Sequence, residues 1–278
     1  MLASTGAGMA ADEIIYSEKR TQTASAISGY VEGRYSDIQD VQDIDAPNGI
    51  EIEGDEWQLR GVVNARANAF NVQVEIDGLQ QDLGLSERDG VRGTIHAYYR
   101  PVGGAFASGA FLRGAVARSD DLDLEVDEEE YLIGGEAAYL ARFATVHLRA
   151  GYGQGSIEVA GLEADTDRVH VGAGANLYLG DNFRLDLDAS YDTADHDLIE
   201  SETFAFDTRA NYRFASRPVS IFAGYRYETS EFRDTVDETE TEASTGTLYA
   251  GARLHFGTQS LRQEDQSGAL WDTLSPLP

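Results

Sequence analysis

The chain has 278 residues, a length that suits one large domain or two small ones. It carries 49 acidic and 21 basic residues, and a net charge of −28 disfavours binding to nucleic acid because phosphate backbones are repelled. There is no cysteine, which excludes disulfides, thiolate metal sites and a cysteine nucleophile. No apolar run approaches the roughly 18–20 residues of a spanning helix.

Residues 1–24 show traces of an export signal. Met1 to Ala10 are small and apolar and end in Gly8-Met9-Ala10, with small residues where a signal peptidase would cut. A charged n-region and a full apolar core are missing. We interpret 1–24 as a residual export signal followed by a polar segment; a frayed terminus is the alternative.

From Ser25 onward, apolar and polar residues alternate with a period of two, which predicts half-buried β-strands. One segment, for example, sets Phe183, Leu185 and Leu187 against Arg184 and Asp186. The pattern predicts twelve strands, over residues 25–36, 56–66, 69–77, 91–100, 105–118, 130–142, 144–153, 168–180, 183–192, 203–214, 219–228 and 246–256.

The connections between these segments alternate between short and long. Short ones such as 101–104, 180–182 and 215–218 carry Pro, Gly, Asp and Asn, which form tight turns. Long ones such as 37–55 and 229–244 are polar and acidic. This alternation predicts consecutive antiparallel hairpins with both chain ends on the short-turn side.

An open sheet of twelve strands would leave two unpaired edges, so we expect a closed barrel. The apolar face carries no charged residue in our register, and it is rich in Ala, Gly and Val. These side chains are too small to fill a barrel of this size. Aromatic residues gather at both ends of the apolar face, as in the girdles of membrane barrels. We therefore predict a barrel with its apolar face outward; a soluble sandwich or lipocalin-like barrel is the alternative.

The last segment ends in Leu254-His255-Phe256 and resembles the terminal strand of bacterial outer-membrane β-barrel proteins, broadly the porin-like group. The resemblance spans residues 25–256 and implies an all-β, transmembrane, antiparallel up-and-down β-barrel of about 12 strands. It also implies short periplasmic turns, long acidic extracellular loops and a place in the outer membrane of a Gram-negative cell. Outer-membrane lipid, lipopolysaccharide and the barrel-assembly machinery are the implied partners.

Residues 257–278 depart from this family pattern, because the family chain ends at its terminal Phe. The segment is polar, and 1–24 and 257–278 would both lie in the periplasm. We expect 257–278 to hang free as a polar tail; a plug that fills the lumen from below is the alternative.

The inward face of the predicted barrel is rich in arginine. By parity it also carries the carboxylates Glu32, Glu75, Asp77, Glu136, Asp186, Asp188, Asp192, Asp207 and Glu228. A net positive wall favours anions; the alternative is that the guanidinium groups only brace the wall. The predicted pore-lining residues are Arg34, Arg60, Arg66, Arg92, Arg100, Arg113, Arg142, Arg149, Arg168, Arg184, Arg209, Arg213, Arg226 and Arg253.

Two other chemistries are weakly indicated. The carboxylates of 121–127 lack the Gly and Glu positions of a calcium loop, so we expect a solvated acidic loop, with weak divalent binding as the alternative. Of the five histidines, His196 alone would lie near the outer rim, and no nucleophile is spaced to pair with it. We expect no enzyme activity, no bound metal and no cofactor.

The predicted function is an outer-membrane channel for passive diffusion of small hydrophilic solutes, with a modest preference for anions. The alternative is a non-conducting barrel, plugged or packed shut, with a role in adhesion or envelope structure.

Overall fold

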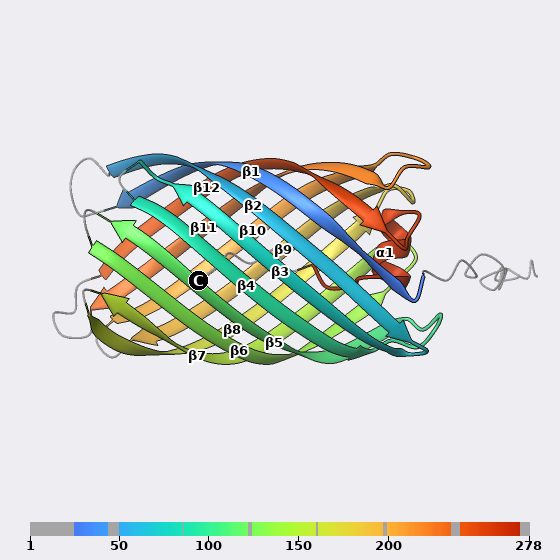
Figure 1. The fold of residues 1–278 in the computed structure, drawn as a ribbon, viewed down its shortest axis with the longest axis horizontal. Helices are drawn as coiled ribbons and strands as arrows, with labels where there is room; N and C mark the ends of the chain where they lie inside the picture. Colours follow the sequence, from blue (N-terminus) through green and yellow to red (C-terminus); the bar gives the residue numbers. More distant parts are fainter. Residues whose placement is uncertain are drawn as a thin grey trace, which may run out of the picture.

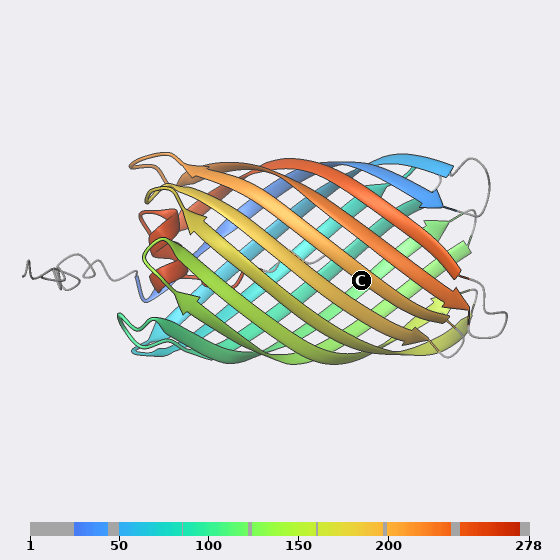
Figure 2. The same cartoon turned by 180° about the vertical axis from the view of Figure 1, so that it is seen from behind.

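The protein is a closed barrel of twelve strands with one short helix near one end (Figures 1 and 2). The computed structural model describes residues 25–43, 50–84, 86–121, 124–159, 161–196, 199–234 and 240–272. The elements are β1 (Ile27–Asp43), β2 (Ile50–Ala67), β3 (Phe70–Asp82), β4 (Ser86–Tyr99), β5 (Phe106–Asp121), β6 (Leu124–Leu140), β7 (Ala144–Val159), β8 (Leu162–Tyr178), β9 (Phe183–His196), β10 (Ile199–Arg213), β11 (Val219–Asp234), β12 (Glu240–Phe256) and α1 (Leu261–Ser267).

Each strand pairs antiparallel with the next one in the chain, and β1 pairs with β12 to close the sheet. In that last pair Gly29 lies opposite Phe256, and on the other side of β1, Ile27 lies opposite Ala65 of β2. The predicted up-and-down barrel of twelve strands is confirmed. Because every strand has two partners, the described sheet has no open edge.

The apolar face of the sheet points outward, as predicted. Leu112 of β5 is 52% exposed, whereas the next residue, Arg113, is 4% exposed and points into the barrel. The same inversion holds around the barrel, where outward Ile, Leu and Val are exposed and inward Arg, Asp and Glu are buried. This arrangement suits a surface solvated by hydrocarbon and a polar interior.

Aromatic side chains mark both ends of the outward face. Towards the long connections Tyr35 packs against Trp57, with ring centroids 5.0 Å apart. Towards the short turns Phe70 packs against Tyr99, with centroids 5.4 Å apart. Such paired aromatic residues sit at the two interfaces of a bilayer, so they delimit the apolar belt.

The strands extend further than the alternation predicted. The acidic stretch 37–55 was expected to be a loop, yet Asp37 pairs with Asp55, and β1 and β2 continue to Asp43 and Ile50. The pattern failed there because both faces are polar beyond the hydrocarbon, so the contrast between faces disappears. Residues 44–49, 122–123 and 235–239, like the predicted export signal within 1–24, lie outside the described residues.

Residues 257–272, the described part of the chain after β12, do not hang free, which corrects our expectation for this part of the C-terminal segment. It turns at Gly257, enters the barrel at the short-turn end, forms α1 and then runs along the lumen (Figure 1). Leu261, Leu270 and Trp271 are 0%, 2% and 5% exposed. The composition predicted a free polar tail because these few apolar residues are dispersed among polar ones. No helix in the described ranges has the length and apolar character to cross a bilayer.

Gly257 makes the reversal possible. Its φ of 76° lies in the left-handed region, which favours glycine. A Cβ at this position would also lie 2.3 Å from the carbonyl oxygen of Ile27. The chain can therefore fold back into the barrel only through a residue without a side chain. We call residues 258–272 the tail.

Candidate functional site

Nearly all of the predicted pore-lining arginines lie inside the barrel. Arg34, Arg60, Arg92, Arg100, Arg113, Arg184, Arg209, Arg213 and Arg253 are buried, and Arg66, Arg149, Arg168 and Arg226 are half-buried. Arg142 is the exception: β6 ends at Leu140, and Arg142 is exposed in the turn before β7. The alternation was continued two residues too far into that turn.

Register places arginine opposite carboxylate on neighbouring strands. Arg60 of β2 lies opposite Asp77 of β3, which lies opposite Arg92 of β4. Arg60 Nη2 is 2.5 Å from Glu75 Oε2, and Arg92 Nε is 3.3 Å from Asp77 Oδ2. These pairs brace the wall across strands, as the alternative interpretation proposed for part of the set.

A second group of pairs lies further along the lumen. Arg113 Nη2 is 2.5 Å from Glu130 Oε1, and Arg168 also binds Glu130. Arg168 Nε is 3.1 Å from Asp192 Oδ1, which in turn lies 2.9 Å from His170 Nδ1. These side chains join neighbouring strands and also link β6 to β8 across β7.

The tail carboxylate Asp272 lies at the centre of four arginines. Its Oδ1 is 2.5 Å from Arg60 Nη1, and its Oδ2 is 2.5 Å from Arg209 Nη2 and 2.7 Å from Arg253 Nη2. Arg184 Nη2 is 3.5 Å from the same Oδ2. We call these five residues the Asp272 cluster.

Two further carboxylates anchor the tail. Asp265 accepts hydrogen bonds from Arg184 Nη1 at 2.6 Å and from the Tyr178 hydroxyl at 2.7 Å. Glu264 Oε2 lies 2.5 Å from His255 Nδ1. Each acidic residue of the tail therefore meets a basic residue of the wall.

The apolar end of the tail fits against β3 and β4. The Trp271 ring stacks on His96, with centroids 6.3 Å apart, and meets Tyr98 edge-on. The side-chain oxygen of Gln73 accepts a hydrogen bond from the Leu270 amide at 2.9 Å, and the Gln73 amide donates to the Trp271 carbonyl. The tail is thus held by specific contacts along its described length.

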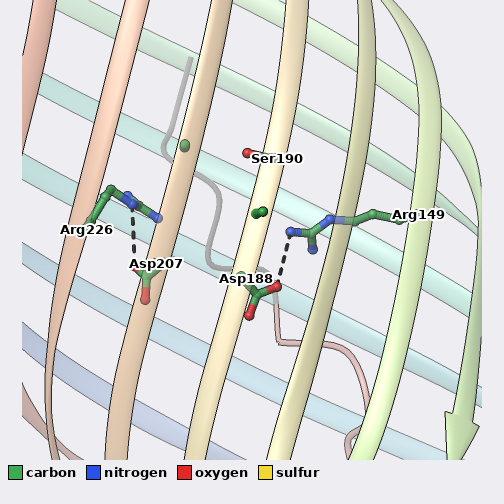
Figure 3. Close-up of a pocket in the computed structure, with 7 residues that line it drawn as sticks. Arg149, Asp188, Ser190, Asp207 and Arg226 are labelled. Carbon is green, nitrogen blue, oxygen red and sulfur yellow. Dashed lines mark ion pairs between the residues drawn. The ribbon is translucent and has the colours of Figure 1, made fainter.

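A small pocket lies in the lumen between β7, β9, β10 and β11. Figure 3 shows Arg149 of β7 pointing at Asp188 of β9, and Arg226 of β11 pointing at Asp207 of β10. These pairs are loose, with N···O distances of 4.0 Å and 3.5 Å. Charged side chains of both signs therefore line this pocket.

Some carboxylates that face the lumen were not predicted. Glu56 pairs with Arg34, Glu130 pairs with Arg113, and the tail adds three more acids. Glu56 and Glu130 have the parity of other inward residues, so strict use of the alternation would have found them. With the tail in place, the excess of arginine predicted for the lumen no longer holds for the described residues.

Ser220, His255 and Glu264 lie in the order of a serine-hydrolase triad. Ser220 Oγ is 2.7 Å from His255 Nε2, and His255 Nδ1 meets the Glu264 carboxylate. However, Ser220 is completely buried, and the acid belongs to the tail. The three groups therefore meet only when the tail keeps substrates out, which favours a structural hydrogen-bond chain.

The other histidines offer no clearer chemistry. His96, His147 and His170 are buried in the lumen. His196 ends β9, and its Nδ1 lies 2.6 Å from Thr166 Oγ1. Within the described part of the chain, no group of three or more metal-binding side chains converges, and the 121–127 stretch lies partly outside that part.

The tail carboxylates differ in how the lumen affects their ionisation. Burial would raise the pKa of Asp272, but the guanidinium groups of Arg209, Arg253, Arg60 and Arg184 outweigh burial and hold the pKa well below its usual value. Docking therefore depends on an ionised Asp272, and its contribution is lost as the pH falls below the ordinary value of 3.8.

Asp265 behaves in the opposite way. Burial raises the pKa of Asp265 to about 7, and Arg184 lowers it only in part. Between pH 3.8, the ordinary pKa of an aspartate, and about pH 7, Asp265 is therefore protonated in the docked tail and ionised in the released tail. Docking becomes stronger as the pH falls through that window.

We predict that the tail is docked most tightly at about pH 5 and released below about pH 4. The chain has two tryptophans, so Trp57→Phe leaves the buried Trp271 as the sole reporter. Quenching of Trp271 fluorescence by acrylamide should pass through a minimum near that pH. In the control Asp265→Asn, quenching should not fall between pH 8 and pH 5, whereas release in acid should remain. Quenching that changes in one direction only across the range would contradict this prediction.

The family comparison agrees with the geometry. Residues 132–260 match the family model described as "Outer membrane protein beta-barrel domain". No curated protein matches the chain.

Several solved structures have a similar course of the chain. The β-domain of the Bordetella autotransporter BrkA is 10% identical, with a TM-score of 0.49, and the match covers 82% of this chain and 100% of that one. The translocator domain of the autotransporter NalP from Neisseria meningitidis is 10% identical, with a TM-score of 0.48 and coverage of 83% and 89%. A deltaS2 mutant of TodX, a monoaromatic hydrocarbon channel, is 8% identical, with a TM-score of 0.44 and coverage of 83% and 90%.

The closed barrel, the outward apolar belt with its aromatic ends, and the family match all describe one class of protein. The chain thus fits a bacterial outer-membrane β-barrel protein, with its strands in the lipid bilayer of the outer membrane.

Proposed function

We propose that the protein is a channel for passive diffusion of small hydrophilic solutes and that its own tail closes it at the short-turn end. The observation that carries the proposal is the Asp272 cluster, in which four wall arginines converge on a residue of the tail. A wall braced only for rigidity would satisfy its arginines from neighbouring strands. Here the four arginines also bind a carboxylate of the tail, a segment that is joined to the barrel at Gly257.

The chemistry of the contacts suits a reversible closure. Most tail anchors are ion pairs and hydrogen bonds, which water can replace once the segment moves. The apolar anchors are few, with Leu261, Leu270 and Trp271 as the largest. Release of the tail would also remove Glu264, Asp265 and Asp272 from the lumen, so the arginine excess and a modest anion preference would return.

We also propose that β12 serves as the recognition strand for the barrel-assembly machinery. Phe256 lies on the outward face at the end of that strand, and the chain turns away from it immediately afterwards. The tail therefore leaves the aromatic side chain accessible from outside the barrel. Lipopolysaccharide is the expected neighbour of the opposite, acidic end.

Removal of the tail tests the closure. In planar bilayers the full chain should give rare, brief openings, whereas a chain ending at Gly257 should give stable steps with a reversal potential favouring chloride. The wall arginines lose their tail partners in this variant, so resistance of the folded barrel to detergent must be checked first.

A second variant keeps the whole chain. Trp271→Ala removes the largest apolar anchor and should increase the frequency of openings without changing their conductance. Silence of a folded, truncated barrel would overturn the channel proposal. That result would support the alternative, a permanently packed barrel with a role in adhesion or envelope structure.

A further inference from the structure

We propose that Asp272 occupies a binding site for multivalent oxyanions, carboxylate or phosphate, and that such an anion opens the channel by competing with Asp272 for the arginines. The inference rests on the proposed function, since it names the class of solute to which the closure responds.

The Asp272 cluster has the composition of an anion site. Arg60, Arg184, Arg209 and Arg253 come from β2, β9, β10 and β12, so they approach the carboxylate from separate parts of the wall. Each of them is at most 2% exposed. Guanidinium groups bind carboxylate and phosphate oxygens through their fixed fork of donors, and exclusion of water strengthens those bonds.

The cluster has more donors than one carboxylate can use. Arg253 Nη1 makes no hydrogen bond with any described residue, and Glu264 Oε1 approaches it only to 4.0 Å. Asp272 contributes a single charge to four guanidinium groups. The wall acids Glu32, Glu75 and Asp186 pair with these arginines and offset most of their charge, but they are fixed in the strands. An oxyanion with more acceptor oxygens than one carboxylate could also bind Arg253 Nη1, so a multivalent oxyanion would be a stronger ligand than Asp272.

Asp272 is also the part of the tail that a solute can displace. Its side chain is 12% exposed, whereas those of Glu264 and Asp265 are 1% and 3% exposed. An anion arriving along the lumen would thus meet Asp272 before the deeper anchors. Release could proceed from Asp272 towards α1.

The test follows the tail directly through Trp271, the neighbour of Asp272, in the full chain carrying Trp57→Phe. Trp57 lies on the outward face and is 61% exposed, so its replacement leaves the lumen unchanged. Citrate or inorganic phosphate should increase acrylamide quenching of Trp271 in a saturable manner. Sucrose should not change the quenching. Potassium chloride at matched ionic strength should raise the quenching much less than citrate and without saturation, because it only screens the charges.

Variants separate competition from general loosening. Asp272→Asn should raise acrylamide quenching of Trp271 without citrate to the level that citrate gives in the full chain, and citrate should then add little, because the competing charge is gone. Asp89→Asn makes the same chemical change on the exposed outer face of β4 and should leave the quenching and its dependence on citrate unchanged. Equal release by citrate and by potassium chloride at matched ionic strength would overturn the inference.

The two proposals fail in different ways. Citrate-specific release of Trp271 without any current through the truncated barrel would uphold the anion site and refute the channel. Current through the truncated barrel without citrate-specific release would uphold the channel and refute the anion site.

Discussion

Replacing Asp186 with leucine should lower the free energy of unfolding by about 3–5 kcal/mol, because a buried ion pair that loses one partner leaves an uncompensated charge. Asp186 is 1% exposed, and its Oδ2 accepts hydrogen bonds from Arg184, Arg209 and Asn211 at 2.8–2.9 Å. Leucine would leave both guanidinium groups short of a counter-charge inside the wall. Unfolding by guanidinium chloride in lipid vesicles measures the effect.

An exposed carboxylate provides the control for this prediction. Asp181 has a side chain 70% exposed and pairs with Arg262 at 3.1 Å. Surface pairs contribute less than about 1 kcal/mol, so Asp181→Asn should hardly change the unfolding curve. If Asp186→Leu were as stable as the unaltered chain, water in the lumen would have to solvate the arginines. The ion pairs of the wall would then not be needed for stability.

Replacing Ile95 with arginine should lower the stability of the inserted barrel by about 2–4 kcal/mol, since a charge would enter the middle of the hydrocarbon layer. Ile95 lies on the outward face of β4 and is 50% exposed, between Val91 and Tyr99 on the same face. Urea titration of insertion into vesicles measures the loss.

Asp89 tests the depth dependence on the same strand and the same face. It is exposed beyond the apolar belt, so Asp89→Arg should cost about 0–1 kcal/mol, as expected near the interface. Equal losses for the two variants would contradict the outward orientation of the belt, which is the basis of the membrane assignment.

The sequence predicted the sheet well because each strand repeats the same physical contrast. Leu112 and Arg113 are neighbours that require opposite environments, one apolar and one polar. When twelve strands repeat this requirement, few folds remain besides a closed barrel with an apolar outer face and a polar interior. The contrast is lost where both faces meet water, which is why the pairing of Asp37 with Asp55 was not predicted. The prediction that Arg142 lines the pore was wrong for a different reason, because the alternation of residues does not show where a strand ends.

The tail could not be predicted from local pattern. Its binding depends on residues up to about two hundred positions away, such as Arg60 with Asp272 or Gln73 with Leu270. No periodicity encodes such complementarity. Composition offered one signal: Leu261, Leu270 and Trp271 are unusual in a segment meant to remain in water. The sequence thus supplied most of the residues of the candidate site, but not the segment that occupies it.

The pairing of β1 with β12 has a consequence for biogenesis. Gly29 and Phe256 stand at opposite ends of the polypeptide, so their contact closes a very long loop and forms late. Before closure there is no interior for residues 258–272 to enter. The tail must therefore be the last piece to fold, and until it does, a newly assembled barrel passes through an open stage.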